Sequence, residues 1–199
     1  MSLPAFMNPQ PAPEISAKAK HVGGGPPAYA NFPFVRQELT FWCWAAVAAA
    51  ISTSRGHGIQ QCQVAAAYGP HSNVPYIHQT LTTHSCCPPS ESVDVSGELE
   101  VALTWIGLHC NVEDVGATTA AEIRKNLVAN QAPLGVFIQW DKGGGHFVAI
   151  VGIDQTDGSF QIYDPSDSHQ NSLYFVTRSA SYLSNYDGAG HWDAVYYLA

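Results

Sequence analysis

The chain has 199 residues, 46% of them hydrophobic and only 12% charged, which suits one domain with a sizeable core. Its net charge of -8 argues against binding to duplex nucleic acid. No basic membrane-binding helix is visible, and no apolar run reaches the roughly 18 residues that a membrane span needs. The small share of charged side chains favours a protein that is secreted or delivered outside the producing cell, although the first 30 residues carry no visible secretory signal.

The N-terminal third of the chain predicts a leader followed by two helices. Residues 1–30 hold many of the prolines and lack apolar periodicity, which indicates a flexible leader or pro-segment ahead of a single domain over 31–199. Residues Thr40–Ser54 predict a helix that Thr40 caps and that is apolar all round, so it should cross the interior. A second helix is expected over Gln60–Tyr68.

The remaining pattern changes from helical to extended. Residues 70–96 are rich in His, Ser, Thr and Pro and predict an irregular connection. Helices are expected over Gly97–Leu108 and Thr119–Ala129. Helices first and strands later predict the α+β class. The expected strands are Leu134–Trp140, His146–Ile153, Ser159–Tyr163, Leu173–Thr177 and Trp192–Leu198.

Five cysteines, an odd number, leave four for bonding if Cys43 is a reactive thiol. In an oxidising compartment the four can form two disulfides, with the adjacent Cys86 and Cys87 bridging outward to Cys62 and Cys110 rather than to each other. The alternative is four reduced, buried thiols. Because these cysteines and the loop histidines lack the spacing of a zinc site, no metal is predicted.

Cys43 has the sequence context of a nucleophile. It stands near the start of the predicted Thr40–Ser54 helix, where the first-turn amides and the positive end of the helix dipole favour a thiolate. Gln37 lies six residues earlier, and its amide, together with the Cys43 backbone N–H, can hold an oxyanion. Taken alone, the two residues have plainer explanations, an inert buried cysteine and a solvated loop glutamine.

His146 and Asp164 are predicted to meet on neighbouring strands. His146 follows three glycines at the mouth of a strand, and Asp164 ends the next strand before Pro165. In an antiparallel pair, the residue numbers of two opposed residues add up to twice the number at the centre of the turn. A turn centred at 155 therefore places His146 opposite Asp164, and one centred at 156 places it opposite Ser166. Either register puts both side chains on one face, where the carboxylate can orient the imidazole. The alternative for Asp164 is a simple turn residue.

These residues, with others along the chain, resemble the papain-like cysteine proteases over about residues 32–198. The branch they resemble most is the bacterial group that contains the AvrRpt2-type effector proteases, of peptidase class C70 and C39-like, and relatives of the staphopains. The matching segments are Gln37, Cys43-Trp44-Ala45-Ala46, Gln61-Cys62, Ala65-Ala66, Cys86-Cys87-Pro88, Gly144-Gly145-His146-Phe147 and Tyr163-Asp164-Pro165.

The resemblance implies a two-lobed fold and a set of roles. A helical N-terminal lobe would carry Cys43 as nucleophile, with Gln37 in the oxyanion hole. An antiparallel, strand-rich C-terminal lobe would carry His146 as general base and acid and Asp164 as its orienting residue. Many relatives have Asn where this chain has Asp164, and a further cysteine downstream of the Cys86-Cys87 pair is missing, which leaves the disulfide pattern open. Candidate substrate-binding residues are Trp44, Gly144, Gly145 and Trp192.

The function expected from the resemblance is a cysteine endopeptidase, a secreted bacterial protease or effector that needs no metal or cofactor. Its partners would be a protein or peptide substrate and an inhibitor or immunity protein. Two alternatives stay open. One is a catalytically silent papain-like binding module, and the other is a relative of the same fold that transfers the acyl group to an amine or processes leader peptides.

Overall fold

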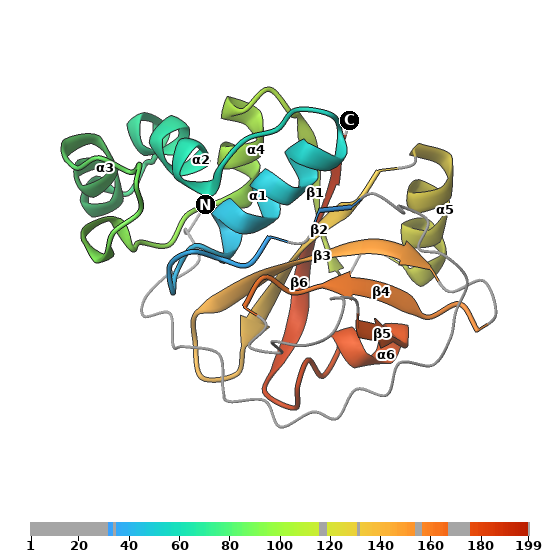
Figure 1. Ribbon diagram of the computed structural model, residues 1–199. Coiled ribbons are helices and arrows are strands. Elements are labelled where there is room, and N and C mark those ends of the chain that lie inside the picture. The colour runs from blue at the N-terminus through green and yellow to red at the C-terminus, as the bar shows by residue number, and fades with distance from the viewer. Residues whose placement is uncertain are drawn as a thin grey trace.

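The computed structural model describes residues 32–33, 35–115, 119–130, 132–153, 157–166 and 176–198. The predicted leader over residues 1–30 lies outside them. Helices and strands follow one another as shown in Figure 1. The helices are α1 (Cys43–Ser54), α2 (Gln61–Tyr68), α3 (Pro75–Thr83), α4 (Leu99–Trp105), α5 (Ala120–Asn130) and α6 (Ala180–Leu183), with 3-10 turns η1 (Gly69–His71) and η2 (Glu91–Val93). The strands are β1 (Cys110–Asp114), β2 (Leu134–Trp140), β3 (Gly145–Ile153), β4 (Phe160–Tyr163), β5 (Val176–Arg178) and β6 (Gly190–Leu198).

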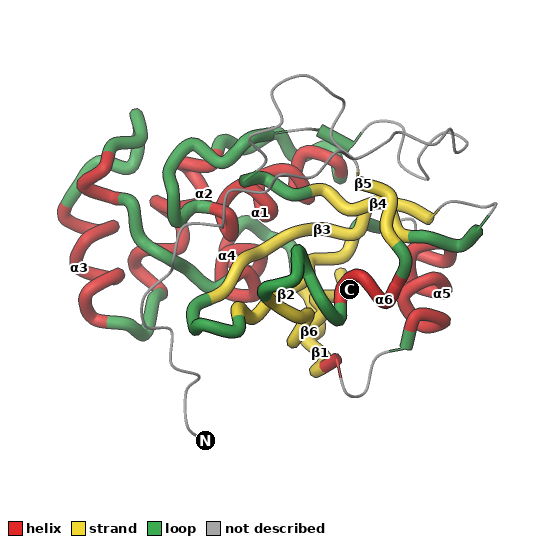
Figure 2. Tube along the Cα trace, turned by 90° about the horizontal axis from the view of Figure 1, so that it is seen from below, coloured by secondary structure: helices red, strands yellow, loops and turns green. Residues whose placement is uncertain are grey.

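The strands form one antiparallel sheet in the order β1-β6-β2-β3-β4-β5. Helices α1 to α4 gather on one side of this sheet, and α5 and α6 lie on the other side, as Figure 2 also shows. The α+β class expected from the order of helices and strands is therefore confirmed. The two-lobed papain-like arrangement stays an expectation.

The sheet separates two apolar cores. On one side Phe147, Ala149 and Val151 of β3 pack with α1, α2 and α4. On the other side Val148 and Ile150 of the same strand pack with residues of α5 and α6. Because successive side chains of a strand point to opposite faces, a strand buried on both faces must be apolar at nearly every position. The continuous apolar run after His146 is the sequence sign of this burial.

Helix α1 runs through the interior, as its composition predicts. Every residue from Cys43 to Ser52 is buried, and the alanines among them let α2, α4 and β3 pack closely around the helix. The predicted start is wrong by three residues, because the helix begins at Cys43 and Thr40 does not cap it. The Asp94 carboxylate instead accepts the backbone N–H groups of Thr40 and Phe41, at 3.2 and 2.7 Å.

The segment 70–96 is more regular than predicted, because it contains α3 and η2. Helix α3 begins with Pro75, a residue suited to the first helical position. It buries only Ile77, Thr80 and Leu81, a stripe too narrow to stand out among its polar neighbours. Strand β1 and helix α6 were also not predicted, and residues 173–175 of the strand expected over Leu173–Thr177 lie outside the described part of the chain.

One of the two disulfides allowed by the cysteine count is present. It joins Cys62 of α2 to Cys87 in the segment that follows α3. Cys86 and Cys110 are free thiols, so the second predicted bridge does not form. Cys86 is buried with its Sγ 3.7 Å from the Leu81 carbonyl oxygen, whereas Cys110 opens β1 at the sheet edge. The two free cysteines thus belong to different elements.

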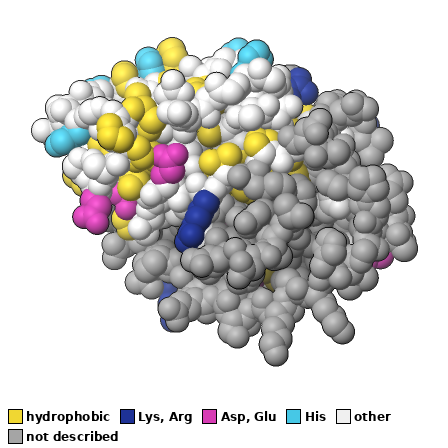
Figure 3. Space-filling view, in the orientation of Figure 1, with side chains coloured by type: hydrophobic (Ala, Val, Ile, Leu, Met, Phe, Trp, Pro, Cys, Tyr) yellow, Lys and Arg dark blue, Asp and Glu magenta, His cyan; other side chains and the backbone are white. Residues whose placement is uncertain are grey.

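The described surface is sparsely charged. Figure 3 shows hydrophobic, histidine and a few acidic side chains on the face over the helices. In the described ranges, no helix has both the length and the apolar character that crossing a membrane requires.

Candidate active site

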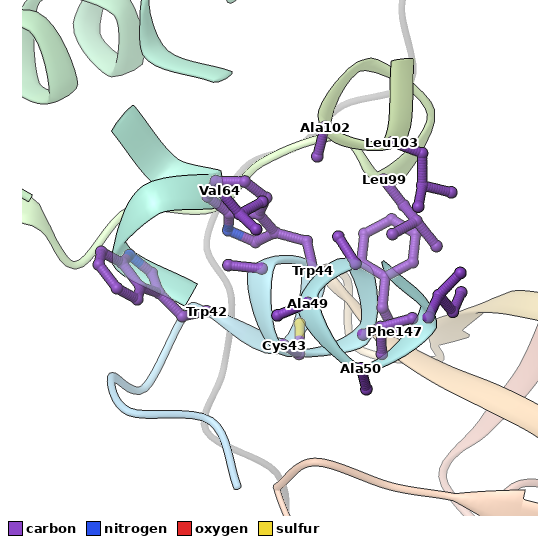
Figure 4. Packing of buried hydrophobic residues seen from close by; sticks show 14 of the residues in the cluster. Trp42, Cys43, Trp44, Ala49, Ala50, Val64, Leu99, Ala102, Leu103 and Phe147 are labelled. Atoms are coloured by element: carbon purple, nitrogen blue, oxygen red, sulfur yellow. The ribbon is translucent and has the colours of Figure 1, made fainter. Parts of the chain in front are cut away.

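The segment Val93–Val95 holds the start of α1 in place. The indole Nε1 atoms of Trp42 and Trp44 donate hydrogen bonds to the carbonyl oxygens of Val93 and Val95, at 2.9 and 3.1 Å. Figure 4 shows both indoles to the same side of Cys43, with the sulfur at the first turn of the helix. Cys43 therefore sits on a turn whose backbone is fixed from both flanks.

His146 and Asp164 meet as the strand register predicts. Strand β3 pairs with β4 so that Ala149 lies opposite Tyr163, an index sum of 312, which is one of the two expected registers. His146 Nε2 lies 2.7 Å from Asp164 Oδ1, and His146 lines one pocket together with Cys43, whose side chain helps to raise the pKa of the imidazole. Since Nε2 bonds the carboxylate, Nδ1 is the ring nitrogen left for the sulfur. The structure thus brings together a thiol, an imidazole and a carboxylate.

Asp164 accepts four hydrogen bonds. Its Oδ1 accepts from His146, from the Ser166 backbone N–H at 2.8 Å and from the Ser166 hydroxyl at 2.7 Å. Its Oδ2 accepts from the Tyr186 hydroxyl at 2.7 Å. Both oxygens are therefore fixed, and the carboxylate cannot turn away from His146 without breaking several bonds.

Two aromatic side chains cover this pair. The Trp140 ring stacks on the His146 ring at 6.0 Å between centroids and 16° between planes. Tyr186 packs against Trp140 from the side, also at 6.0 Å, and both aromatic residues are buried. His146 is only 5% exposed. The ion pair is thus shielded from water, which strengthens its electrostatic interaction.

The protonation of the pair follows from these contacts. Burial alone would lower the pKa of His146, but the Asp164 carboxylate and the Cys43 side chain raise that pKa to about 10. Burial alone would raise the pKa of Asp164, but His146, Ser166 and Tyr186 hold it well below its ordinary range. At neutral pH the imidazole is therefore protonated and the carboxylate ionised.

Gln37 lies on the segment that leads into α1 and lines the pocket beside Cys43. Its Nε2 donates to the carbonyl oxygens of Leu39 and Thr40, at 3.0 and 2.6 Å. Its Oε1 is buried and has no hydrogen-bond partner among the described residues. For an oxyanion role, one of the two N–H groups must turn from its carbonyl toward the bound substrate.

A pocket opens over these residues, with mostly apolar and neutral walls. Three of the four predicted substrate-binding residues line it, namely Trp44, Gly144 and Gly145. Trp192 does not line it, because its place on β6, opposite Ile138 of β2, packs it against the second core. The remaining lining residues, all within the described ranges, are Gln37, Thr40, Phe41, Cys43, Ser96, Gly97, Phe137, Trp140, His146, Phe147 and Ser166.

The turn before His146 is held by a side chain that sequence reasoning did not single out. Gln139 Nε2 donates to the Gly144 carbonyl oxygen at 2.6 Å, and the Trp140 backbone N–H donates to the same oxygen at 3.1 Å. Gly143 and Gly144 both have positive φ, at 92° and 80°, which only glycine adopts without strain.

Within the described residues, no three His, Cys, Asp or Glu side chains gather as a metal site.

A model of the Peptidase C39 like family matches residues 29–193. The chain belongs to this family. Membership in the Peptidase C39 like family makes a cysteine peptidase the activity to expect, and it covers the segments that carry Cys43, His146 and Asp164. Among curated proteins, none matches the chain. The AvrRpt2-type branch of the resemblance stays a prediction.

Several supporting residues could not be found from sequence. Tyr186 and Asp94 carry no local signal because they reach the site from loops, and the stacking of Trp140 on His146 depends on the fold. Ser166 stood two residues after Asp164, a spacing typical of a turn that bonds the Asp side chain. That local signal was available, whereas the Tyr186 contact depends on the fold.

Proposed function

We propose that the protein is a cysteine endopeptidase in which Cys43 is the nucleophile, His146 the general acid and base, and Asp164 the residue that orients His146. The observation that carries this proposal is that one buried imidazole bonds the Asp164 carboxylate and lines the same pocket as Cys43, whose side chain helps to raise the imidazole pKa. A protonated imidazole beside a thiol is the state that favours thiolate attack.

The reaction would follow the course of acyl transfer to sulfur. The Cys43 thiolate attacks the peptide carbonyl carbon, a C–S bond forms, and the carbonyl π electrons move to oxygen. When the C=O bond re-forms, the C–N bond breaks and the amine leaves with the proton from His146. Water then attacks the thioester carbon while His146 accepts its proton, the C–S bond breaks, and the acid product leaves with the Cys43 thiolate and the protonated His146 restored.

The negative oxygen of the intermediate needs donors. The backbone N–H of Cys43, a first-turn amide without an intrahelical acceptor, supplies one. Gln37 would supply the second by turning one N–H from its present carbonyl partner. An extended substrate would run between the Gly97 backbone and the Gly144–Gly145 turn, which leave its path open.

The biological setting belongs to the same proposal. The substrate would be a protein or peptide, and the protein would act outside the producing cell as a secreted bacterial protease or effector, with an inhibitor or immunity protein as a further partner. The sparsely charged composition and the disulfide between Cys62 and Cys87, which forms in oxidising compartments, support export. We also propose that the fold has the two-lobed papain-like arrangement and that the chain belongs to the AvrRpt2-type branch.

The proposal is tested by cleavage and by thiol chemistry on one set of proteins. Wild type should cleave an unstructured protein such as casein, Cys43→Ala should be inactive, and the control Cys110→Ala should match wild type. Iodoacetamide at about pH 6 should alkylate Cys43 but not the free thiols of Cys86 and Cys110. Burial raises the pKa of Cys86, and that of Cys110 to about 11, so both stay protonated and unreactive at this pH. Equal cleavage by wild type and Cys43→Ala would disprove the proposal.

A further inference from the structure

Gln61 is a buried polar side chain that holds the residues on both sides of Gln37. It is the first residue of α2 and only 1% exposed. Its Nε2 donates to the Arg36 carbonyl oxygen at 2.6 Å, and its Oε1 accepts the Glu38 backbone N–H at 3.0 Å. One amide therefore bonds the residue before Gln37 and the residue after it.

The same segment is tied to the sheet on its other side. The Gln37 backbone N–H donates to the Pro165 carbonyl oxygen at 2.9 Å, next to Asp164. The Tyr163 hydroxyl, from the end of β4, donates to the Val35 carbonyl oxygen. The segment 35–38 is thus held between the helix that carries Gln61 and the strand that leads to Asp164.

The position of Gln61 is itself fixed. The next residue, Cys62, is bonded by the disulfide to Cys87, and the first turn of α2 is closed by a capping box in which Gln63 Oε1 accepts the Gln60 backbone N–H at 2.9 Å. A side chain anchored this well can transmit a definite position to the backbone that it bonds. A buried amide kept at such a place has both ends satisfied, which offsets its cost of desolvation.

We propose that Gln61 is a positioning residue for the oxyanion hole, and that its two bonds to the backbone on either side of Gln37 set where the Gln37 amide lies relative to Cys43. The proposal rests on the proposed function, since it assigns no chemistry to Gln61 itself. Its effect is on the stabilisation of the negative oxygen and not on the formation of the thiolate. His146 and Asp164 should keep their contacts without it, because the described hydrogen bonds of Gln61 reach neither residue.

The physical reason is geometric. Without the Gln61 amide, the Arg36 carbonyl and the Glu38 N–H lose their partners and the segment must move to find others. A shift of about 1 Å in a positioning group can cost on the order of 100-fold in rate, and loss of one oxyanion donor costs about 100- to 1,000-fold. A displaced but still present donor should therefore cost less than a deleted one.

The test compares Gln61→Met with Gln79→Met, the same change at an exposed glutamine of α3 that no described hydrogen bond joins to the segment 35–38 or to Gln61. Three readouts are measured on each: kcat/KM for a peptide that wild type cleaves, the affinity of acetyl-Phe-glycinal, and the rate of alkylation of Cys43 by iodoacetamide. The aldehyde forms a C–S bond with Cys43 and places its oxygen in the oxyanion hole, whereas alkylation forms no oxyanion.

For Gln61→Met we expect kcat/KM to fall by about tenfold or more, mainly because kcat falls, and the affinity of the aldehyde to fall by a similar factor. The rate of alkylation should stay within about twofold of wild type. Gln79→Met should leave all three unchanged. A Gln61→Glu variant adds a rescue. Its carboxyl, when protonated at low pH, restores both the donor and the acceptor, so its activity relative to wild type should rise as pH falls.

The possible failures are distinct. If Gln61→Met lowers alkylation as much as aldehyde affinity, or matches Gln79→Met in all three readouts, Gln61 does not position the oxyanion hole. If wild type cleaves peptides and binds the aldehyde, these results overturn the inference alone. If wild type neither cleaves peptides nor binds the aldehyde through Cys43, the proposed function fails, and the role of Gln61 fails with it.

Discussion

Asp164 is the residue on which the geometry of the candidate site depends most. A carboxylate with four donors is held in one orientation and kept ionised, so it presents a fixed negative charge to His146. Asn, found at this position in many papain-like relatives, accepts hydrogen bonds only through its one amide oxygen and cannot supply the charge. The charge therefore sets the protonation of His146 in this chain.

Tyr186 should support catalysis through Asp164. In Tyr186→Phe, Oδ2 of Asp164 loses its donor, and we expect kcat to fall about threefold to tenfold, with KM little changed and unfolding about 1 to 2 kcal/mol easier. Steady-state kinetics and urea unfolding measure the two effects. The control is Tyr182→Phe, because the Tyr182 hydroxyl bonds Asp187 instead. Equal losses of kcat in both variants would contradict a role through Asp164.

The ion pair should give stability a particular dependence on pH. The pKa of His146 is raised to about 10, so its contribution is complete below about pH 6.5 and is lost as pH rises toward 10. The pKa of Asp164 is lowered, so its contribution is present above about pH 4 and is lost on further acidification. The free energy of unfolding of wild type should thus exceed that of Asp164→Asn by about 1 to 3 kcal/mol near pH 6, and by less near pH 10.

Urea unfolding at several pH values measures this difference. Asp157→Asn is a matched control, because Asp157 Oδ1 also accepts the backbone N–H and hydroxyl of a serine two residues later, Ser159, but faces no histidine in a described contact. Its difference from wild type should not change between pH 6.5 and 10. A constant difference for Asp164→Asn over the same range would show that the pair is not charged as described.

At the scale of single residues, the sequence predicts the candidate catalytic residues better than the residues that hold them in place. Cys43, His146 and Asp164 are recognisable because spacing, glycines and a proline mark their local settings. Gln61 was visible only as part of a resembling dipeptide, and Tyr186 not at all, because hydrogen bonds between residues far apart in the chain leave no local pattern.

Among the elements, the β2–β3 hairpin determines where His146 stands. Gly145 leaves room for the Phe137 ring on the paired strand, since a Cβ at this position would lie 2.1 Å from Phe137 Cζ and 3.0 Å from the Ile138 carbonyl oxygen. The close packing of the two strands therefore depends on the missing side chain. The residue after it is the proposed base.

Gly145→Ala should accordingly destabilise the fold by about 1 to 3 kcal/mol and lower kcat/KM, because Phe137 and the start of β3 must separate. The free energy of unfolding in urea and peptide cleavage provide the measurements. Gly58→Ala is the control, since a Cβ there meets nothing within 4 Å. The explanation fails if the two alanine variants are equally stable.

The elements that the sequence predicts well are those with a strong internal pattern. Strand β2 has the predicted bounds because it is an apolar run between Pro133 and a glycine turn. Helix α3 was missed because only three of its residues are buried, and β1 because four of its five residues are exposed at the edge of the sheet. Whether such a segment forms a helix or a strand depends on the other elements against which it packs.

For the whole molecule, the order of helices and strands predicts the class but not the order of the strands. Strands β1 and β6 are distant in sequence yet pair with each other, and β6 inserts between β1 and β2. Such pairings depend on which apolar faces must be covered once all the elements are present. The segment 35–38 follows the same logic, since it bonds both to α2 and to the end of β4.

Apart from His146 and Cys43, the walls of the pocket are neutral, which has a consequence for selectivity. The chain carries a net charge of -8, yet none of the residues that line the cleft, all of them described, is Lys, Arg, Asp or Glu. Inside the cleft, peptides would therefore be sorted by the size and shape of their side chains. Any preference for cationic substrates would have to arise earlier, during the diffusional approach to an acidic molecule, and dissolved salt would weaken it without altering the fit.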